Sequence, residues 1–377
     1  MRAHAVHVCM ISGYRINTGG LENAVTELSN FLIRQDIKVT TFNLDYMDSE
    51  INFQNSRLIL THYYNILPSV LKFANYERYA YSLKVWRKIK HLGPFDVIHG
   101  HGGYCFFSAL FRDKTPFVMT FHGLKKSANL RIYGPNSRIL KSPRHLPLYY
   151  PEEIAAKKCD LAITPSKSVR DELVSLYGIN SSKIKVIYNG VNVNRFRPFD
   201  KNLAKRILGL PERKKYVIWV GNNPKLKGLS IAIDAVKGLE NVYLLVVGIS
   251  GSNFANVIFW GEVQDKQLLC NLYNAASLLI LPTLYEGFPL VTLEAMACGL
   301  PIVISKECPA REIINDGIEG FIVNERNPKV YAEKVKNILD NDRHYQEISF
   351  KCRKLAEKYS WEKQGKEYLK IYESIIR

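Results

Sequence analysis

Short apolar runs alternate with helical stripes along the whole chain, and this alternation predicts an α/β protein with parallel sheets. Strand-like runs occur in the first half near 5–12, 38–44, 95–101, 116–123, 161–166 and 185–191. A polar stretch after residue 191 carries no strand pattern until the run YVIWVG, where the alternation starts again. We therefore expect two doubly wound domains of similar size, residues 1–193 and residues 194–360, followed by a last helix at about 361–377.

The stretch 281–305 carries the densest candidate chemistry. A short strand there leads into a loop with Glu286, and Pro289 stands where a helix would begin. Glu294 lies on that helix, whose positive end and free N–H groups face the loop. This arrangement suits a ligand that carries both phosphate and hydroxyl groups. The alternative is an ordinary strand–loop–helix unit with two solvated glutamates.

A second candidate loop follows the first strand. Gly19 and Gly20 open a segment in which Val25, Leu28 and Leu32 keep helical spacing. Glycines at a helix start after a strand allow backbone N–H groups to approach a phosphate. A flexible turn needs the same residues, so the pair alone is a weak signal.

The amino-acid composition indicates the cellular compartment and the kind of partner. Seven scattered cysteines with no CxxC pair predict a reducing compartment, with neither a disulfide framework nor a zinc site. The chain has no apolar run long enough to span a bilayer, and its first apolar run is too short for a secretory signal, so we expect a cytoplasmic protein. The net charge of +17 is weighted to the first half and indicates an anionic partner there. No recognised nucleic-acid motif is present, which disfavours nucleic acid as that partner.

Two segments of the first half are rich in basic residues. Residues 46–92 interleave aromatic and basic side chains, among them Tyr63, Tyr64, Tyr76, Tyr79, Tyr81 and Trp86. A helix there would set Lys84, Arg87, Lys88 and His91 on one side, with Leu83, Val85, Trp86 and Ile89 as apolar surface. Such a helix lies on an anionic bilayer or is an ordinary surface helix, and the pattern does not choose between these. Residues 124–150 are polar, basic and interrupted by prolines, and they are long for a plain loop, which predicts an acceptor-binding excursion or a disordered stretch.

Three histidines follow the predicted strands of the first domain. His99 and His101 lie at the end of one strand and His122 at the end of the next, at the edge where doubly wound sheets place their ligands. Their spacing lacks the helical i, i+4 pattern and a nearby carboxylate, so a metal site is disfavoured. His122 is the better candidate for an active-site contact.

The ordered set of motifs resembles the retaining glycosyltransferases of the GT-B architecture, family-4 type, over nearly the full chain. EGFPLVTLEAMACGLPIV resembles the signature of that family, in which two glutamates are separated by seven residues. Weaker matches are GGLE at 19–22, FHG at 121–123, YNGVN at 188–192, VG…KG at 220–228, FWGEV at 259–263 and DGIEGFIV at 316–323. The resemblance implies that the C-terminal helix crosses back to the first domain.

The resemblance also implies a role for each matching residue. Glu294 would accept hydrogen bonds from the ribose hydroxyls of a nucleotide, and Glu286 would contact hydroxyls of the donor sugar. Lys227 would pair with the diphosphate, and His122 would contact the sugar near its reacting carbon. The expected catalytic residues are thus His122, Glu286 and Lys227. The expected donor-binding residues are Gly19, Gly20, Gly221, Asn222, Lys227, Glu286, Gly287, Phe288, Pro289, Leu290 and Glu294.

One position departs from the family pattern. The family usually carries arginine directly after the glycine of the VG strand, and here Asn222 follows Gly221. Lys225 is a candidate to supply the missing cation.

The function expected from the resemblance is transfer of a sugar, with retention, from a UDP- or GDP-sugar to a hydroxyl acceptor. Family resemblance implies no metal or other cofactor. The basic segments favour a lipid-linked acceptor, such as a polyprenyl-linked glycan, at an anionic membrane surface, and hence a peripheral membrane protein. The alternatives are a GT-B epimerase or phosphorylase, and a catalytically weak or inactive partner subunit that binds sugar nucleotide.

Overall fold

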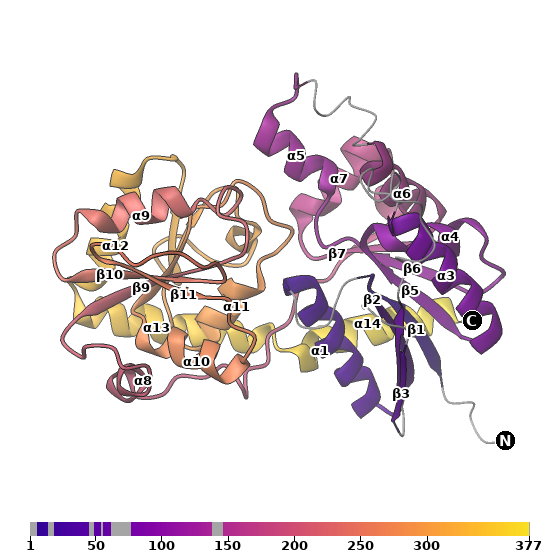
Figure 1. The fold of residues 1–377 in the computed structure, drawn as a ribbon, viewed down its shortest axis with the longest axis horizontal. Helices are drawn as coiled ribbons and strands as arrows, with labels where there is room; N and C mark the ends of the chain where they lie inside the picture. The colour runs from indigo at the N-terminus through magenta and orange to yellow at the C-terminus, as the bar shows by residue number, and fades with distance from the viewer. Residues whose placement is uncertain are drawn as a thin grey trace. The chain divides into compact units, whose positions relative to one another are not determined.

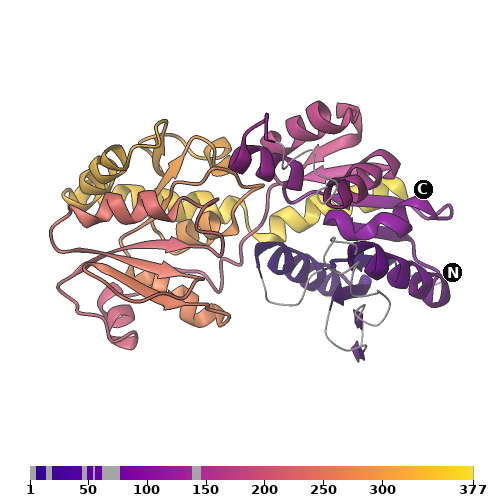
Figure 2. The same cartoon turned by 45° about the horizontal axis from the view of Figure 1, so that its top comes forward.

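The computed structural model describes residues 6–13, 19–44, 49–53, 56–61, 77–137 and 146–376. Two compact units are present (Figures 1 and 2): unit 1 comprises residues 1–189 with 361–377, and unit 2 comprises residues 190–360. The division falls close to the one expected from the sequence. The last helix belongs to unit 1, so the expectation that the chain crosses back is confirmed.

Unit 1 is built on an eight-stranded sheet in the order β3-β4-β2-β1-β5-β6-β7-β8, parallel except for the β3–β4 pair. Its strands are β1 (His7–Ile11), β2 (Lys38–Leu44), β3 (Ser49–Phe53), β4 (Ser56–Thr61), β5 (Val97–His101), β6 (Phe117–Thr120), β7 (Leu161–Thr164) and β8 (Ile184–Val186). The antiparallel pair β3–β4 was not expected within 46–92. It lies at the sheet edge, where Ile51 stays 43% exposed, so it lacks the continuous apolar run that marks a buried strand.

Helices of unit 1 are α1 (Gly20–Arg34), α3 (Glu77–Leu92), α4 (Phe106–Leu110), α5 (Lys125–Tyr133), α6 (Leu146–Lys158), α7 (Lys167–Tyr177) and α14 (Trp361–Ile375), with short 3₁₀ turns η1 (Gly102–Cys105) and η3 (Ser181–Lys183). Helix α14 lies beside α1 (Figure 1). Gly365 allows this approach, since a Cβ there would come within 2.3 Å of Cδ1 of Phe31. A glycine inside a helix weakens it locally, and here the close helix–helix contact offsets that cost.

Two expectations about the basic segments need correction. In α3, Val85 and Ile89 are buried in the core of unit 1 beside Phe117, so these apolar residues cover the sheet and are not available to a bilayer. Within the described part of 124–150, α5 covers Lys125–Tyr133 and α6 begins at Leu146, so these residues are not a disordered stretch. An acceptor-binding role for the segment stays a prediction. Part of both segments lies outside the described residues: 46–48, 54–55 and 62–76 in the first, with Tyr63, Tyr64 and Tyr76, and 138–145 in the second.

Unit 2 contains a six-stranded parallel sheet in the order β11-β10-β9-β12-β13-β14. Its strands are β9 (Lys215–Val220), β10 (Val242–Val247), β11 (Val257–Gly261), β12 (Leu278–Leu281), β13 (Ile302–Ser305) and β14 (Gly320–Val323). Its helices are α8 (Lys201–Ile207), α9 (Leu229–Lys237), α10 (Lys266–Ala275), α11 (Leu290–Ala297), α12 (Pro328–Leu339) and α13 (Asp342–Lys358), with the 3₁₀ turn η4 (Pro309–Glu312). Helices α12 and α13 are separate elements, and the side chain of Asn341 caps α13 by accepting from His344 N.

Strand order in unit 2 reverses between β9 and β12. From β9 the chain builds outward through β10 and β11, and it then returns to place β12 on the other side of β9. Open parallel sheets bind ligands at the carboxyl ends of strands beside such a reversal. The fold therefore predicts that the ligand site of unit 2 lies at this edge of the sheet.

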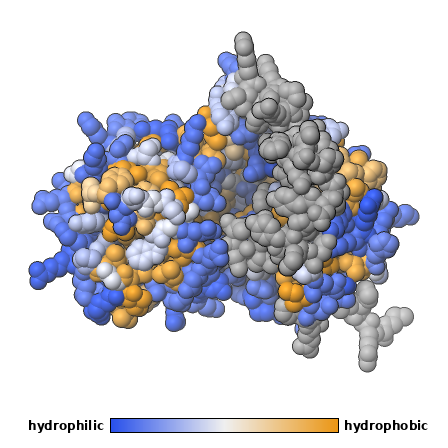
Figure 3. All heavy atoms as spheres, in the orientation of Figure 1, coloured by the Kyte–Doolittle hydropathy of each residue, from blue (hydrophilic) through white to orange (hydrophobic). Residues whose placement is uncertain are grey.

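Three further features concern the cysteines, the surface and the length of the helices. All seven cysteines are free and buried. On the face drawn in Figure 3, hydrophilic side chains make up much of the described surface. Among the described residues, no helix is both long enough and apolar enough to cross a bilayer.

Candidate active site

The candidate site of unit 2 is formed by two loops that leave neighbouring strands. One loop follows β9 and contains Gly221, Asn222 and Lys227, and the other follows β12 and leads through Glu286 into α11. Since β9 and β12 pair in parallel, with Leu278 opposite Val217, both loops start at the same edge of the sheet.

Lys227 and Glu286 form an ion pair between these loops. Nζ of Lys227 lies 2.6 Å from Oε1 of Glu286, and the two side chains are only 14% and 17% exposed. Oε1 of Glu286 is buried and accepts no well-aligned hydrogen bond from the described residues. The contact is thus electrostatic, and the carboxylate keeps acceptor capacity that a ligand hydroxyl could use.

Gly221 gives Lys227 its path to Glu286. A Cβ at position 221 would come within 2.1 Å of Cδ of Lys227. Any other residue at this position would therefore push the lysine side chain aside. The sequence singled out Gly221 for donor binding, and the contact with Lys227 gives a physical reason why glycine is needed here.

Buried hydrogen bonds hold the two loops together. The hydroxyl of Thr283 donates to the carbonyl of Leu226 at 2.9 Å, and the hydroxyl of Ser305 donates to the carbonyl of Thr283 at 2.7 Å. Gly228 adopts φ of +65°, and a Cβ there would lie 2.0 Å from the carbonyl oxygen of Pro282. These supporting residues were missed in the sequence analysis, because a threonine or serine after a strand gives no signal of its own.

Glu294 lies on α11 and is 8% exposed. The hydroxyl of Tyr273 on α10 donates to its Oε2 at 3.0 Å. Burial raises the pKa of Tyr273 well above its ordinary value, so this hydroxyl stays protonated and fixes the carboxylate. Together with the half-buried ion pair of Glu286, this contradicts the alternative of two solvated glutamates.

The start of α11 agrees with the prediction from the sequence. Pro289 is the N-cap residue, and among the described residues no side chain caps the first turn. Phe288 and Leu290 are buried, with 4% and 9% exposure, which fixes the backbone of Gly287 and its neighbours. Helix N-termini without a side-chain cap suit phosphate or sugar oxygens.

Asn222 and Lys225 both have exposed side chains in the loop after β9. The loop therefore presents an ammonium group at position 225, where the family pattern would place a guanidinium at position 222. The structure leaves the substitution by Lys225 as a prediction for experiment.

In unit 1, Gly19 and Gly20 lie at the N-terminus of α1. Gly19 is extended, and a Cβ there would lie 3.0 Å from Oε2 of Glu22, so the carboxyl group of Glu22 turns back toward the helix start. Burial raises the pKa of Glu22 to about 7. This helix start is thus already faced by a carboxyl group, a contact that the GGLE motif alone does not indicate.

The three histidines of unit 1 lie together at the carboxyl ends of β5 and β6. Nδ1 of His101 is 3.0 Å from Nε2 of His122, and the rings of His99 and His101 are 4.2 Å apart. Burial lowers the pKa of His122 to about 4, so the ring is neutral at neutral pH. Among the described residues, no group of three histidine, cysteine or carboxylate side chains is arranged to hold a metal ion.

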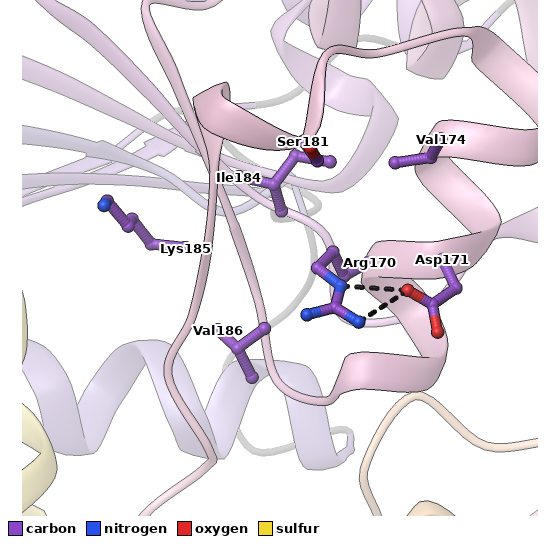
Figure 4. A pocket seen from close by; sticks show the side chains of 7 residues that line it. All are labelled: Arg170, Asp171, Val174, Ser181, Ile184, Lys185 and Val186. Atoms are coloured by element: carbon purple, nitrogen blue, oxygen red, sulfur yellow. Dashed lines mark hydrogen bonds and ion pairs between the residues drawn. The ribbon is translucent and has the colours of Figure 1, made fainter.

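A pocket also lies on unit 1, between α7 and β8 (Figure 4). Its lining residues are Arg170, Asp171, Val174, Ser181, Ile184, Lys185 and Val186. Arg170 is paired with its neighbour Asp171 at 2.8 Å on the same helix. Since none of the expected donor-binding residues lines this pocket, its chemistry does not bear on the candidate site.

Comparison with known proteins identifies the class. Residues 200–355 match the family Glycosyl transferases group 1, and residues 18–195 match Glycosyltransferase Family 4. Between them the two matches span nearly all of both units. The chain belongs to the GT-B glycosyltransferases of group 1, and it is an enzyme of the glycosyltransferase class.

Individual relatives agree with this class. An uncharacterised glycosyltransferase of Methanocaldococcus jannaschii is 29% identical over 314 residues, which covers 76% of this chain and 77% of that one. Sucrose-phosphate synthase from Thermosynechococcus elongatus superposes with a TM-score of 0.83 at 18% identity, covering 98% of this chain and 99% of that one. HepE of Anabaena, in complex with UDP and glucose, superposes with a TM-score of 0.75 at 18% identity, covering 98% and 100%. The predicted GT-B fold is confirmed.

Proposed function

We propose that this protein is a retaining glycosyltransferase that moves a sugar from a UDP- or GDP-sugar to a hydroxyl acceptor. The observation that carries the proposal is the Lys227–Glu286 pair, which sets a cation beside a buried carboxylate oxygen with unused acceptor capacity. A nucleotide sugar needs both groups, because its diphosphate is anionic and its sugar hydroxyls are hydrogen-bond donors. The complex of HepE with UDP and glucose supports the same class of donor.

In this proposal each residue of unit 2 has a separate task. Glu294, held by Tyr273, accepts the two ribose hydroxyls. Glu286 accepts from hydroxyls of the donor sugar, and Lys227 stabilises the charge that accumulates on the departing diphosphate. The first N–H groups of α11 add to this stabilisation. Because these groups already supply positive charge, we expect turnover that persists when divalent metal is chelated.

Nucleotide binding tests this assignment directly. A thermal-shift panel of UDP, GDP, ADP and their sugars should raise the melting temperature most for the true donor, since a ligand of the folded state stabilises by RT ln(1 + [L]/Kd). Glu294→Ala should weaken nucleotide binding about tenfold or more, through the loss of charge-assisted hydrogen bonds. Glu333→Ala, an exposed glutamate on α12, is the matched control. Full nucleotide affinity in Glu294→Ala would show that the ribose assignment is wrong.

The acceptor and the stereochemistry are part of the proposal. Retention is proposed because the motifs resemble those of retaining glycosyltransferases, and the anomeric configuration of the product, read by proton NMR, tests it. The net charge of +17 supports an anionic, lipid-linked acceptor such as a polyprenyl-linked glycan. Because Val85 and Ile89 are in the core, membrane contact would depend on basic side chains. Co-sedimentation with liposomes should therefore require anionic lipid, and indifference to that lipid counts against the membrane proposal.

Asn222 supports a second candidate, a sugar-nucleotide-binding partner subunit with weak or no catalysis of its own. Its amide cannot supply the charge of the usual arginine. Release of nucleoside diphosphate by the isolated chain in the presence of acceptor would eliminate this candidate. The same assay without acceptor separates transfer from the epimerase and phosphorylase alternatives.

A further inference from the structure

The ring nitrogens of His99, His101 and His122 in unit 1 differ in their hydrogen-bond partners. Nδ1 of His99 is 2.7 Å from the hydroxyl of Tyr372, and its Nε2 is 2.7 Å from the hydroxyl of Thr120. Both nitrogens of His99 are therefore satisfied by hydroxyl groups, which can donate or accept. His101 and His122 face each other instead, with Nδ1 of His101 at 3.0 Å from Nε2 of His122.

Only one proton can lie between two neutral imidazoles. Burial lowers the pKa of His122 to about 4 and that of His101 well below its ordinary value, so both rings are neutral at pH 7. A neutral imidazole carries one N–H donor and one bare acceptor nitrogen. Either His101 donates from Nδ1, or His122 donates from Nε2.

The second nitrogen of His101 decides between these two arrangements. His101 is 1% exposed, and its Nε2 is buried with no hydrogen-bond partner in the part of the chain that the structure describes. If His122 were the donor, the one proton of His101 would sit on this nitrogen as a buried N–H without an acceptor. Orphaned buried N–H groups are rarer in proteins than unfilled buried acceptors.

We infer that His101 is a positioning residue that donates from Nδ1–H to Nε2 of His122 and so holds His122 in the tautomer with its proton on Nδ1. His122 then presents Nδ1–H as a neutral donor to an oxygen of the substrate. Which ring nitrogen carries the proton is set by the hydrogen bond that the other makes, and His101 makes that bond here. The inference rests on the proposed function and on the expectation, drawn from the family resemblance, that His122 contacts the sugar near its reacting carbon.

Two substitutions at position 101 separate the hydrogen bond from the packing. In His101→Asn, the amide nitrogen occupies nearly the place of Nδ1 and keeps a donor there, whereas His101→Leu fills a similar volume without a donor. We expect His101→Asn to retain turnover within about threefold. We expect His101→Leu to lose about tenfold in kcat, the effect of one misdirected hydrogen bond, with a much smaller change in KM.

Tautomers are read directly from the nitrogen shifts of ¹⁵N-histidine-labelled protein at pH 7. We expect His122 to show a protonated Nδ1 and a bare Nε2 in the wild type and in His101→Asn, and to lose that preference in His101→Leu. A protonated Nε2 on His122 of the wild type would overturn the inference, with no need for any variant to fold. A different result tests the substrate contact of His122. Unchanged turnover in His122→Ala would show that His122 does not contact the substrate, and the tautomer measured in the wild-type protein would still stand.

Discussion

Lys227 and Glu286 allow a double-mutant test that separates catalysis from structural support. Replacing Lys227 by methionine keeps most of the side-chain volume and removes the ammonium group. If this group stabilises the leaving diphosphate, kcat should fall by ~10²–10³-fold, as for the loss of one donor to developing negative charge. Lys237→Met, at an exposed position on α9, is the control for a lysine-to-methionine change in the same unit.

The same substitution has a structural cost that can be estimated from the burial of the pair. Exposed ion pairs contribute about 0.2–1 kcal/mol, and breaking a fully buried pair costs about 3–5 kcal/mol. Side chains that are 14% and 17% exposed lie between these limits. We expect Lys227→Met to lower the unfolding free energy by about 2 kcal/mol, or roughly 4–8 °C in the melting temperature of a unit of this size.

Glu286→Gln in the Lys227→Met background completes the cycle. Removing the uncompensated carboxylate should restore most of the melting temperature, because a neutral amide does not need a cation beside it. Turnover, measured as release of nucleoside diphosphate under saturating donor, should stay low. Recovery of turnover together with stability would refute the reasoning, since Lys227 would then act only by neutralising Glu286.

Three further predictions follow from contacts in both units. Gly228→Ala should be far more destabilising in thermal melts than Gly209→Ala, because both glycines have φ near +65° but only a Cβ at 228 would meet the carbonyl of Pro282; equal losses would contradict the clash. Glu152→Gln should gain melting temperature over the wild type as pH rises from 5 to 8. Burial raises the pKa of Glu152 to about 7 in the folded protein, so protonated Glu152 contributes its full stability below pH 4.5 and this contribution is lost as the pH rises through 7. A melting-temperature difference between Glu152→Gln and wild type that stays constant with pH would count against this. Lys225→Ala should reduce turnover more than donor binding, and an unchanged rate would rule out its substitution for the missing arginine.

The parts of the fold that were predicted from the sequence are those with continuous apolar runs or helical stripes. The strands of unit 2 and helix α11 have residues such as Ile280, Leu293 and Val303 that are fully buried, and full burial produces an unambiguous apolar pattern. The β3–β4 pair was missed because β3 is an exposed edge strand, with Ile51 at 43% exposure, and only Ile59 and Thr61 of β4 are buried. The helices within 124–150 were missed because α5 buries only Ser127, so its sequence carries no apolar stripe.

Short motifs in the sequence identify the candidate site residues. The residues that hold them in place do so through tertiary contacts, which no local sequence pattern encodes. Tyr273, for example, supports Glu294 through a hydrogen bond between residues on different helices, and no sequence motif contains both. His101 was weighed as a metal ligand, and its contact with His122 arises because β5 and β6 pair with His101 opposite Thr120. Spacing in sequence could not supply this register.

The ion pair of Lys227 with Glu286 shows how far topology could extend such predictions. The two residues are far apart in the sequence, and the strands β10 and β11 come between them along the chain. In the sheet, β9 and β12 are neighbours, so the loops after them must share one edge. A lysine and a glutamate in those two loops can therefore meet only because the strand order reverses between β9 and β12. Strand order is decided by how helices cover both faces of the sheet, and this packing is the information that the sequence pattern alone lacks.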